Sequence, residues 1–153
     1  MISEFPQFGP GKYQAVKWAF VDLIRKITNY EPVILIVKSE SFREKVKRIL
    51  IRAHINLSRV SFIIHDTDRS WMRDSGPIIV KNSHNETKAL HFKFNSWAKY
   101  HNYSKDSKVP AAVASYLNIK LLSVLYKGKH VVLEGGAIEI NGSGTLITTE
   151  ECL

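Results

Sequence analysis

Asp68-Arg-Ser-Trp-Met-Arg-Asp-Ser-Gly-Pro-Ile-Ile-Val80 is the segment from which the fold and the function of this chain are best approached. It places Trp71, Arg73 and Asp74 in a tight loop that a Gly-Pro pair ends before the next strand. A carboxylate can accept parallel N–H bonds from a guanidinium while an indole ring lies against the flat cation. The segment therefore predicts a site for an organic cation at a strand end, and a purely structural turn is the alternative that the residues leave open.

A second acid follows sixty residues later, in Val131-Val-Leu-Glu-Gly-Gly136. Glu134 stands at the end of an apolar run and is followed by two glycines. A Gly-Gly pair also marks bulges and close approaches of the backbone, so a structural role is open here too. Two acids at strand ends with a Trp nearby favour a cationic substrate. Neither acid is a nucleophile.

The remaining chain alternates helical and extended patterns. Apolar residues at a helical period predict helices over Tyr13–Ile27, Phe42–His54 and Pro110–Leu117. Short apolar runs predict strands over Pro32–Val37, Val60–Ile64, Pro77–Lys81, Ala89–Phe94, Lys120–Ser123, His130–Glu134, Ala137–Ile140 and Thr145–Thr149. The last two strands flank a hairpin turn at Asn141–Gly144. This mixture predicts an α/β fold in a single domain over the 153 residues.

Charge and cysteine usage narrow the class of protein. The formal net charge is +8, but the cations are scattered, and the densest group, Arg43 to Arg52, is typical of the solvated face of a helix. Nucleic-acid binding is therefore the weaker interpretation. The dispersed histidines predict no metal site, and Cys152, the single thiol, is interpreted as inert. One cysteine, no membrane-spanning apolar run and no signal-peptide pattern after Met1 predict a cytoplasmic protein.

Four ordered segments together resemble one family. They are Ser70–Pro77, Phe94-Asn-Ser-Trp97, Leu133–Gly136 and Gly144–Leu153. The order and spacing resemble those of the agmatine deiminase and bacterial peptidylarginine deiminase family of guanidine-modifying enzymes. The resemblance runs from about Gly9 to the last residue, and it favours a functional role for the Trp97 and Glu134 segments, which alone would be interpreted as structural.

The resemblance implies a fold and a chemistry. The family fold is the pentein fold, an α/β propeller of ββαβ modules around a central pocket, of which this chain would hold about two modules and the start of a third. The family reaction hydrolyses a guanidinium to a ureido group and releases ammonia through a cysteine thiolate and a histidine acid. It uses no metal or organic cofactor.

The resemblance also implies roles for individual residues. Asp74 corresponds to the carboxylate that binds the guanidinium, and Trp71 to the aromatic residue beside the pocket. Glu134 corresponds to the glutamate that orients the catalytic histidine. Arg73 and Gly76 correspond to scaffold residues of the first loop.

Departures from the family pattern limit these roles. The catalytic histidine, a second guanidinium-binding aspartate and the catalytic cysteine lie downstream of the part that this chain resembles. Cys152 corresponds to a structural position. The resemblance thus predicts a deiminase domain incomplete at its C-terminus and slightly shortened at its N-terminus. Arg69, where the family usually has an acid, is expected to repel an amine or guanidinium beside the pocket, which argues against agmatine as the specific substrate.

We therefore expect a fragment of an agmatine deiminase-like hydrolase, inactive by itself, whose parent converts agmatine to N-carbamoylputrescine on the route to putrescine. The expected partner is a small guanidinium compound. No membrane association is expected, and a homo-oligomeric state of the parent is left open. Two other functions stay open: a deiminase of protein-bound or free arginine, and a non-catalytic remnant that only binds.

Overall fold

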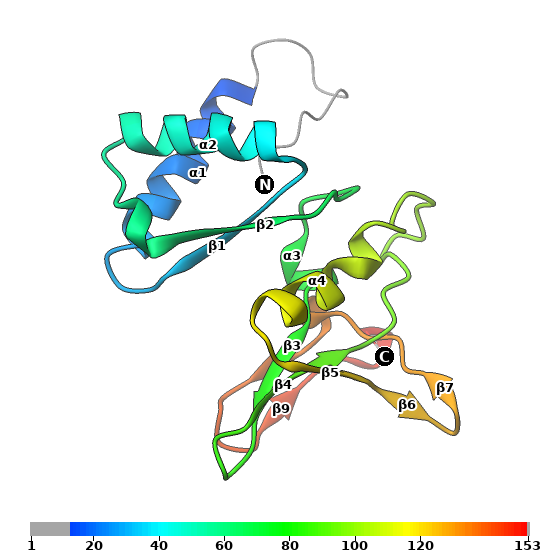
Figure 1. Ribbon diagram of the computed structural model, residues 1–153. Helices are drawn as coiled ribbons and strands as arrows, with labels where there is room; N and C mark the ends of the chain where they lie inside the picture. The colour runs from blue at the N-terminus through cyan, green and yellow to red at the C-terminus, as the bar shows by residue number, and fades with distance from the viewer. Residues whose placement is uncertain (1–12, 153) are drawn as a thin grey trace. The chain divides into compact units, whose positions relative to one another are not determined.

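The computed structural model describes residues 13–152, which form two compact units on either side of Asp66 (Figure 1). The fold is of mixed α/β class, as predicted. The parts of the expected resemblance that fall on residues 9–12 and on Leu153 lie outside the described residues.

The first unit is built from two helices and a parallel pair of strands. Its elements are α1 (Tyr13–Ile27), β1 (Val33–Val37), α2 (Glu40–Arg52), the 3-10 turn η1 (Leu57–Arg59) and β2 (Val60–Ile64). β1 and β2 pair in parallel from Val33↔Val60 to Val37↔Ile64, with α2 as the crossover between them. Ser39 caps α2 by accepting the Phe42 N–H at its Oγ.

The core of this unit draws on every major element. Its buried members are Val21, Ile24, Val37, Val46, Leu50, Ala53, Ile55 and Val60. On α2, Val46 and Leu50 are buried in this core. In α1 the buried residues of this core are Val21 and Ile24, whereas Val16 and Leu23 are about half exposed. The core therefore covers only part of the apolar face of this helix.

The second unit contains a three-stranded sheet followed by short hairpins. Its elements are α3 (Met72–Ser75), β3 (Ile78–Lys81), β4 (Thr87–His91), η2 (Asp106–Lys108), α4 (Val109–Tyr116), β5 (Lys120–Ser123), β6 (Leu125–Tyr126), β7 (Lys129–His130), η3 (Gly135–Ala137), β8 (Glu139–Ile140), β9 (Leu146–Ile147) and η4 (Glu150–Cys152). β3 and β4 are antiparallel, β4 and β5 are parallel, and α4 packs against β4 and β5 (Figure 1). The succession β3-β4-α4-β5 is therefore a ββαβ arrangement.

Two sequence predictions need correction in this unit. The expected tight loop around Asp74 contains a single helical turn, α3, which Ser75 holds through its Oγ bond to the Trp71 carbonyl, 2.9 Å long. The expected strand His130–Glu134 ends as a hairpin strand at His130, and only Val132 continues it, through a parallel bridge to Lys93. The hairpin β6–β7 was missed, although Lys127 and Gly128 form its turn with φ of 48° and 74°.

Candidate active site

The first acid is fixed by α3. Asp74 lies in this turn, and neighbouring Arg73 ties the turn to the segment after Glu134. Arg73 Nε donates to the carbonyl oxygen of Gly135 at 2.9 Å, and Arg73 Nη2 lies 2.6 Å from Glu139 Oε1. The arginine therefore has a scaffold role, as predicted, by joining two segments that are more than sixty residues apart in sequence.

The two glycines allow the second segment to approach α3. A Cβ atom at Gly135 would overlap the carbonyl oxygen of Arg73, and one at Gly136 would lie 2.5 Å from Asp74 Oδ1. At Gly135 a larger residue would require a shift of the backbone, and at Gly136 it would displace the Asp74 carboxylate. The Gly-Gly pair thus marks a close backbone approach, and that approach is what brings Glu134 and Asp74 to one site.

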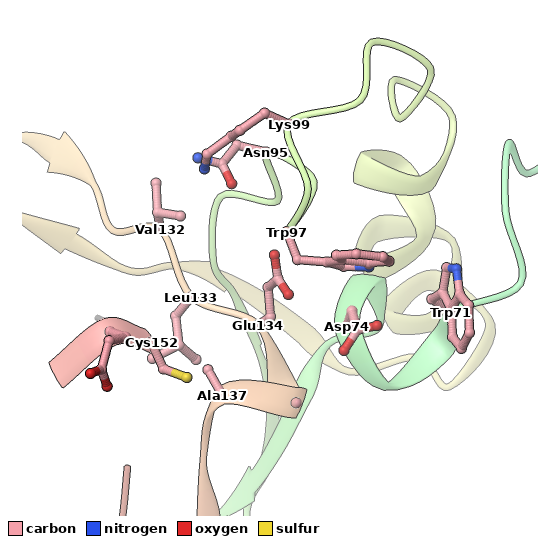
Figure 2. Close-up of a pocket in the computed structure, with 12 residues that line it drawn as sticks. Trp71, Asp74, Asn95, Trp97, Lys99, Val132, Leu133, Glu134, Ala137 and Cys152 are labelled. Carbon is pink, nitrogen blue, oxygen red and sulfur yellow. The ribbon is translucent and has the colours of Figure 1, made fainter. Parts of the chain in front are cut away.

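Both predicted acids line a single pocket of about 550 Å³. Figure 2 shows Asp74 on its helical turn beside Trp71, with Glu134 on the facing segment and Trp97 beside both. Trp71 and Trp97 lie edge to face, with ring centroids 6.3 Å apart, and each is about half exposed. The structure therefore brings together the three residues that the sequence singled out and adds Trp97, which composition alone would place in a core.

The electrostatics of the two acids leave them available to a ligand. Within residues 13–152, neither carboxylate accepts a hydrogen bond or joins an ion pair. Burial raises the pKa of Asp74, and the nearby Arg73 opposes this shift. Burial and the negative charge of Asp74 raise the pKa of Glu134, while Lys99 lowers it. Two close carboxylates with raised pKa values form a site where a cation is favoured.

The wall that carries Trp97 is held from outside the pocket. The buried Asp106 carboxylate accepts the backbone N–H groups of Asp68 and Arg69 at 2.8 and 3.2 Å. Asp68 in return accepts the N–H of Lys105 at 2.8 Å. The Arg69 guanidinium lies over the Tyr100 ring at 3.9 Å, so this residue does not line the pocket, where the sequence had placed its repulsive charge.

Cys152 and Glu151, on η4, line the same pocket, which the sequence did not predict for either. The thiol is exposed. No group of three or more His, Cys, Asp and Glu side chains in the described part of the chain could hold a metal ion. In that part of the chain, no helix has the length and apolar character needed to cross a bilayer.

The cations outside the pocket are partly paired. On α2, Glu40 and Glu44 form ion pairs with Arg43, and Glu44 also binds Lys47 at 2.9 Å. The densest basic segment is thus a mixed-charge helix face. This arrangement gives the nucleic-acid interpretation no support from this helix.

Comparisons with known proteins match this chain over most of its length. A family model described as Porphyromonas-type peptidyl-arginine deiminase matches residues 3–153. The chain is 34% identical over 140 residues to the agmatine deiminase of Pseudomonas putida and 31% identical over 137 residues to that of Pseudomonas fluorescens, covering 88% of this chain in both cases. A solved C. jejuni agmatine deiminase with substrate bound is 26% identical with a TM-score of 0.74, covering 92% of this chain and 38% of that one. The chain spans about a third of the length of the curated relatives that it matches, 35% in both Pseudomonas proteins.

Proposed function

The chain belongs to the Porphyromonas-type peptidyl-arginine deiminase family, and on this premise we propose that it supplies the guanidinium-binding part of a deiminase site. One observation carries the proposal: Asp74 and Glu134 line one pocket beside two tryptophans, and neither carboxylate accepts a hydrogen bond or joins an ion pair among the described residues. A guanidinium is planar, offers parallel N–H donors and is weakly hydrated, so it matches a carboxylate and an aromatic wall better than an ammonium does.

In this proposal each residue has a separate task. Asp74 accepts N–H bonds from the guanidinium, and Trp71 covers one side of the cation. Glu134 supplies a second negative charge and, as in the family pattern, orients the group that protonates the departing ammonia. The rise in both pKa values then has a functional meaning, since a bound cation offsets the cost of keeping two close carboxylates ionised.

The parent reaction proposed here is hydrolysis of agmatine to N-carbamoylputrescine and ammonia. Water supplies the oxygen of the ureido group, and one C–N bond of the guanidinium breaks. Protein-bound or free arginine is the alternative substrate. The proposal includes a partial propeller of ββαβ modules, for which β3-β4-α4-β5 is the supporting observation. It also includes one incomplete deiminase domain, a cytoplasmic location and an oligomeric parent.

The 153-residue chain alone is proposed to bind guanidinium compounds without hydrolysing them. The covalent step requires a thiolate aimed at the guanidinium carbon and an acid for the leaving ammonia. Cys152 lines the pocket, but its position matches a structural residue of the family. A binding module that never takes part in catalysis is the second candidate, and the shared pocket favours it equally as long as no turnover is seen.

Binding and turnover can be measured separately. Titration of the purified chain with butylguanidine, followed by NMR, should shift the indole signals of Trp71 and Trp97, and Asp74→Asn should weaken binding about tenfold or more. Ammonia release from agmatine should stay at background in the wild type and in Cys152→Ala. Binding that does not depend on Asp74 would contradict the proposed site. Turnover that Cys152→Ala abolishes would make Cys152 a nucleophile and refute the proposed inactivity.

A further inference from the structure

We propose that Lys99 selects the tail of the bound molecule, so that the pocket prefers guanidino compounds ending in a carboxylate over those ending in an ammonium. The inference rests on the proposed function, because it takes the guanidinium to lie at Asp74. It concerns the opposite end of the ligand, for which neither the sequence pattern nor the relatives assign a residue in this chain, and it favours the arginine-type alternative of the proposed function over agmatine as the substrate.

Lys99 is presented to the pocket by a closed loop. Its backbone N–H donates to the Ser96 carbonyl at 2.9 Å, and Ser96 Oγ donates to the Tyr100 carbonyl at 2.9 Å. Ser96 is fully buried, whereas the Lys99 side chain is exposed and lines the pocket. Both residues have positive φ, 61° at Ser96 and 56° at Lys99, which is uncommon outside glycine. The surrounding contacts must therefore maintain this turn.

The next residues of the wall provide those contacts. Tyr100 packs edge to face against Trp97, with centroids 5.8 Å apart, and the Arg69 guanidinium lies over the Tyr100 ring. Arg69 Nη2 also donates to Asn102 Oδ1 at 2.9 Å. Arg69 thus holds the loop, and the cation that lines the pocket is Lys99. The repulsion that the sequence assigned to Arg69 is reassigned to Lys99.

The charges around the pocket are arranged asymmetrically. In Figure 2, Lys99, Glu134, Asp74 and Trp71 follow one another across the view. The charge of Lys99 acts on Glu134 but is not among the charges that act on Asp74. A guanidinium bound at Asp74 would neutralise that end of the pocket. Its tail, extending past Glu134, would then meet an ammonium.

One other charged residue lines the pocket and has the opposite preference. Glu151 lies on η4 beside Cys152, and a carboxylate there would attract an ammonium tail. Lys99 lines the pocket on the Glu134 side, and its charge lowers the pKa of Glu134. We therefore assign the selection to Lys99, and Glu151 is the competing residue in the test below.

Three ligands of similar length test the assignment: guanidinobutyrate with a carboxylate tail, butylguanidine with a neutral tail and agmatine with an ammonium tail. NMR titration of the 153-residue chain at low ionic strength should give affinities in that order, each step about three- to five-fold. Lys99→Met should remove the preference for the carboxylate. Lys99→Gly should do the same while relieving the left-handed backbone, which guards against a loss of fold in the first variant. Lys93→Met is the matched control, because this exposed lysine does not line the pocket.

The outcomes separate this inference from the proposed function. If butylguanidine binds through Asp74 but the order of the three ligands is the same in both Lys99 variants, the assignment to Lys99 is refuted and the guanidinium site stands. If agmatine binds most tightly and Glu151→Gln removes that preference, Glu151 selects the tail and the inference is also refuted. If none of the three ligands binds, the proposed function itself fails.

Discussion

The two compact units of the chain use their buried residues for different purposes. Before Asp66, eight apolar residues from two helices, two strands and their connections form one core. The buried polar residue among those described there, Thr28, follows the end of α1 and donates its hydroxyl to the Ile24 carbonyl at 2.8 Å. After Asp66, the buried polar residues are Ser75, Ser96 and Asp106, and each holds a loop that borders the pocket. Burial stabilises the fold in the first unit and positions side chains in the second.

This difference predicts which changes affect stability and which affect binding. An apolar core is non-directional, so its loss is felt as a loss of free energy of unfolding. A loop held by specific hydrogen bonds and by a close glycine contact loses its geometry when one contact is removed. The following predictions, from the largest expected effect to the smallest, test that distinction.

The largest effect is expected from Leu50→Ala in the first core. Leu50 is fully buried, and its truncation should lower the free energy of unfolding of residues 13–66 by about 3 kcal/mol through lost burial and a cavity. Affinity of the pocket for butylguanidine should stay unchanged at low urea. Urea unfolding followed by residue-resolved NMR measures both. Ile51→Ala, at an exposed position of the same helix, is the control. A parallel loss of pocket affinity would show that the two units depend on each other energetically.

The second prediction concerns the carboxylate that organises the wall of the pocket. Asp106 is 2% exposed and accepts two backbone N–H groups, so Asp106→Ala should leave both unsatisfied and destabilise the second unit by about 2 kcal/mol. Exchange broadening of the Trp97 indole signal should accompany the loss. Asp106→Asn keeps one acceptor oxygen and should cost less. Equal damage from both variants would mean that the negative charge, and not the acceptor, holds the loop.

The third prediction uses two glycines with opposite properties. Gly136 has no space for a Cβ beside Asp74, whereas Gly128 has open space but a φ of 74°. Gly136→Ala should move Asp74 away from Glu134 and weaken guanidinium binding about tenfold. Gly128→Ala should lower the free energy of unfolding by about 1 kcal/mol through backbone strain and leave binding unchanged. Isothermal titration and urea unfolding of both variants decide. Unchanged binding in Gly136→Ala would show that the close approach does not set the site geometry.

Much of the fold and of the site was accessible from the sequence. The family resemblance is confirmed, and so is the α/β class. The hairpin around Asn141–Gly144 is also confirmed. These features depend on local patterns, such as hydrophobic period and turn residues, which short stretches of sequence carry. The roles of Asp74, Trp71 and Glu134 stay predictions, although the structure places the three in one pocket.

The rest depended on contacts between distant segments. The sequence placed Arg69 beside the pocket because it precedes Trp71, but stacking on Tyr100 holds its guanidinium outside. The position of Lys99 at the pocket was not predicted, because it depends on left-handed backbone at Ser96 and Lys99, where the sequence has no glycine. Lys127 and Gly128 form the turn of the β6–β7 hairpin, and a glycine at this position is a local signal from which the hairpin could be predicted.

The smallest effect is expected from neutralising the acids, and it has a sign opposite to that of the core variants. The folded chain raises the pKa of Asp74 above 3.8 and that of Glu134 above 4.5, mainly by burial. The folded state therefore retains protons that the unfolded state has lost. Ionisation destabilises the fold as pH rises from the ordinary pKa through the raised one, and the cost persists at neutral pH.

Asp74→Asn and Glu134→Gln should each raise the free energy of unfolding at neutral pH by about 0.5 kcal/mol, since both groups are substantially solvated. The gain should vanish below about pH 3, where both carboxyl groups are protonated in both states. Because the charge of Asp74 contributes to the shift of Glu134, the double variant should gain less than the sum of the single ones. Urea unfolding of the four proteins across this pH range provides the measurement. A Glu134→Gln variant that loses stability at neutral pH would show that attraction to Lys99 outweighs burial, and that the two residues form a pair already before a ligand binds.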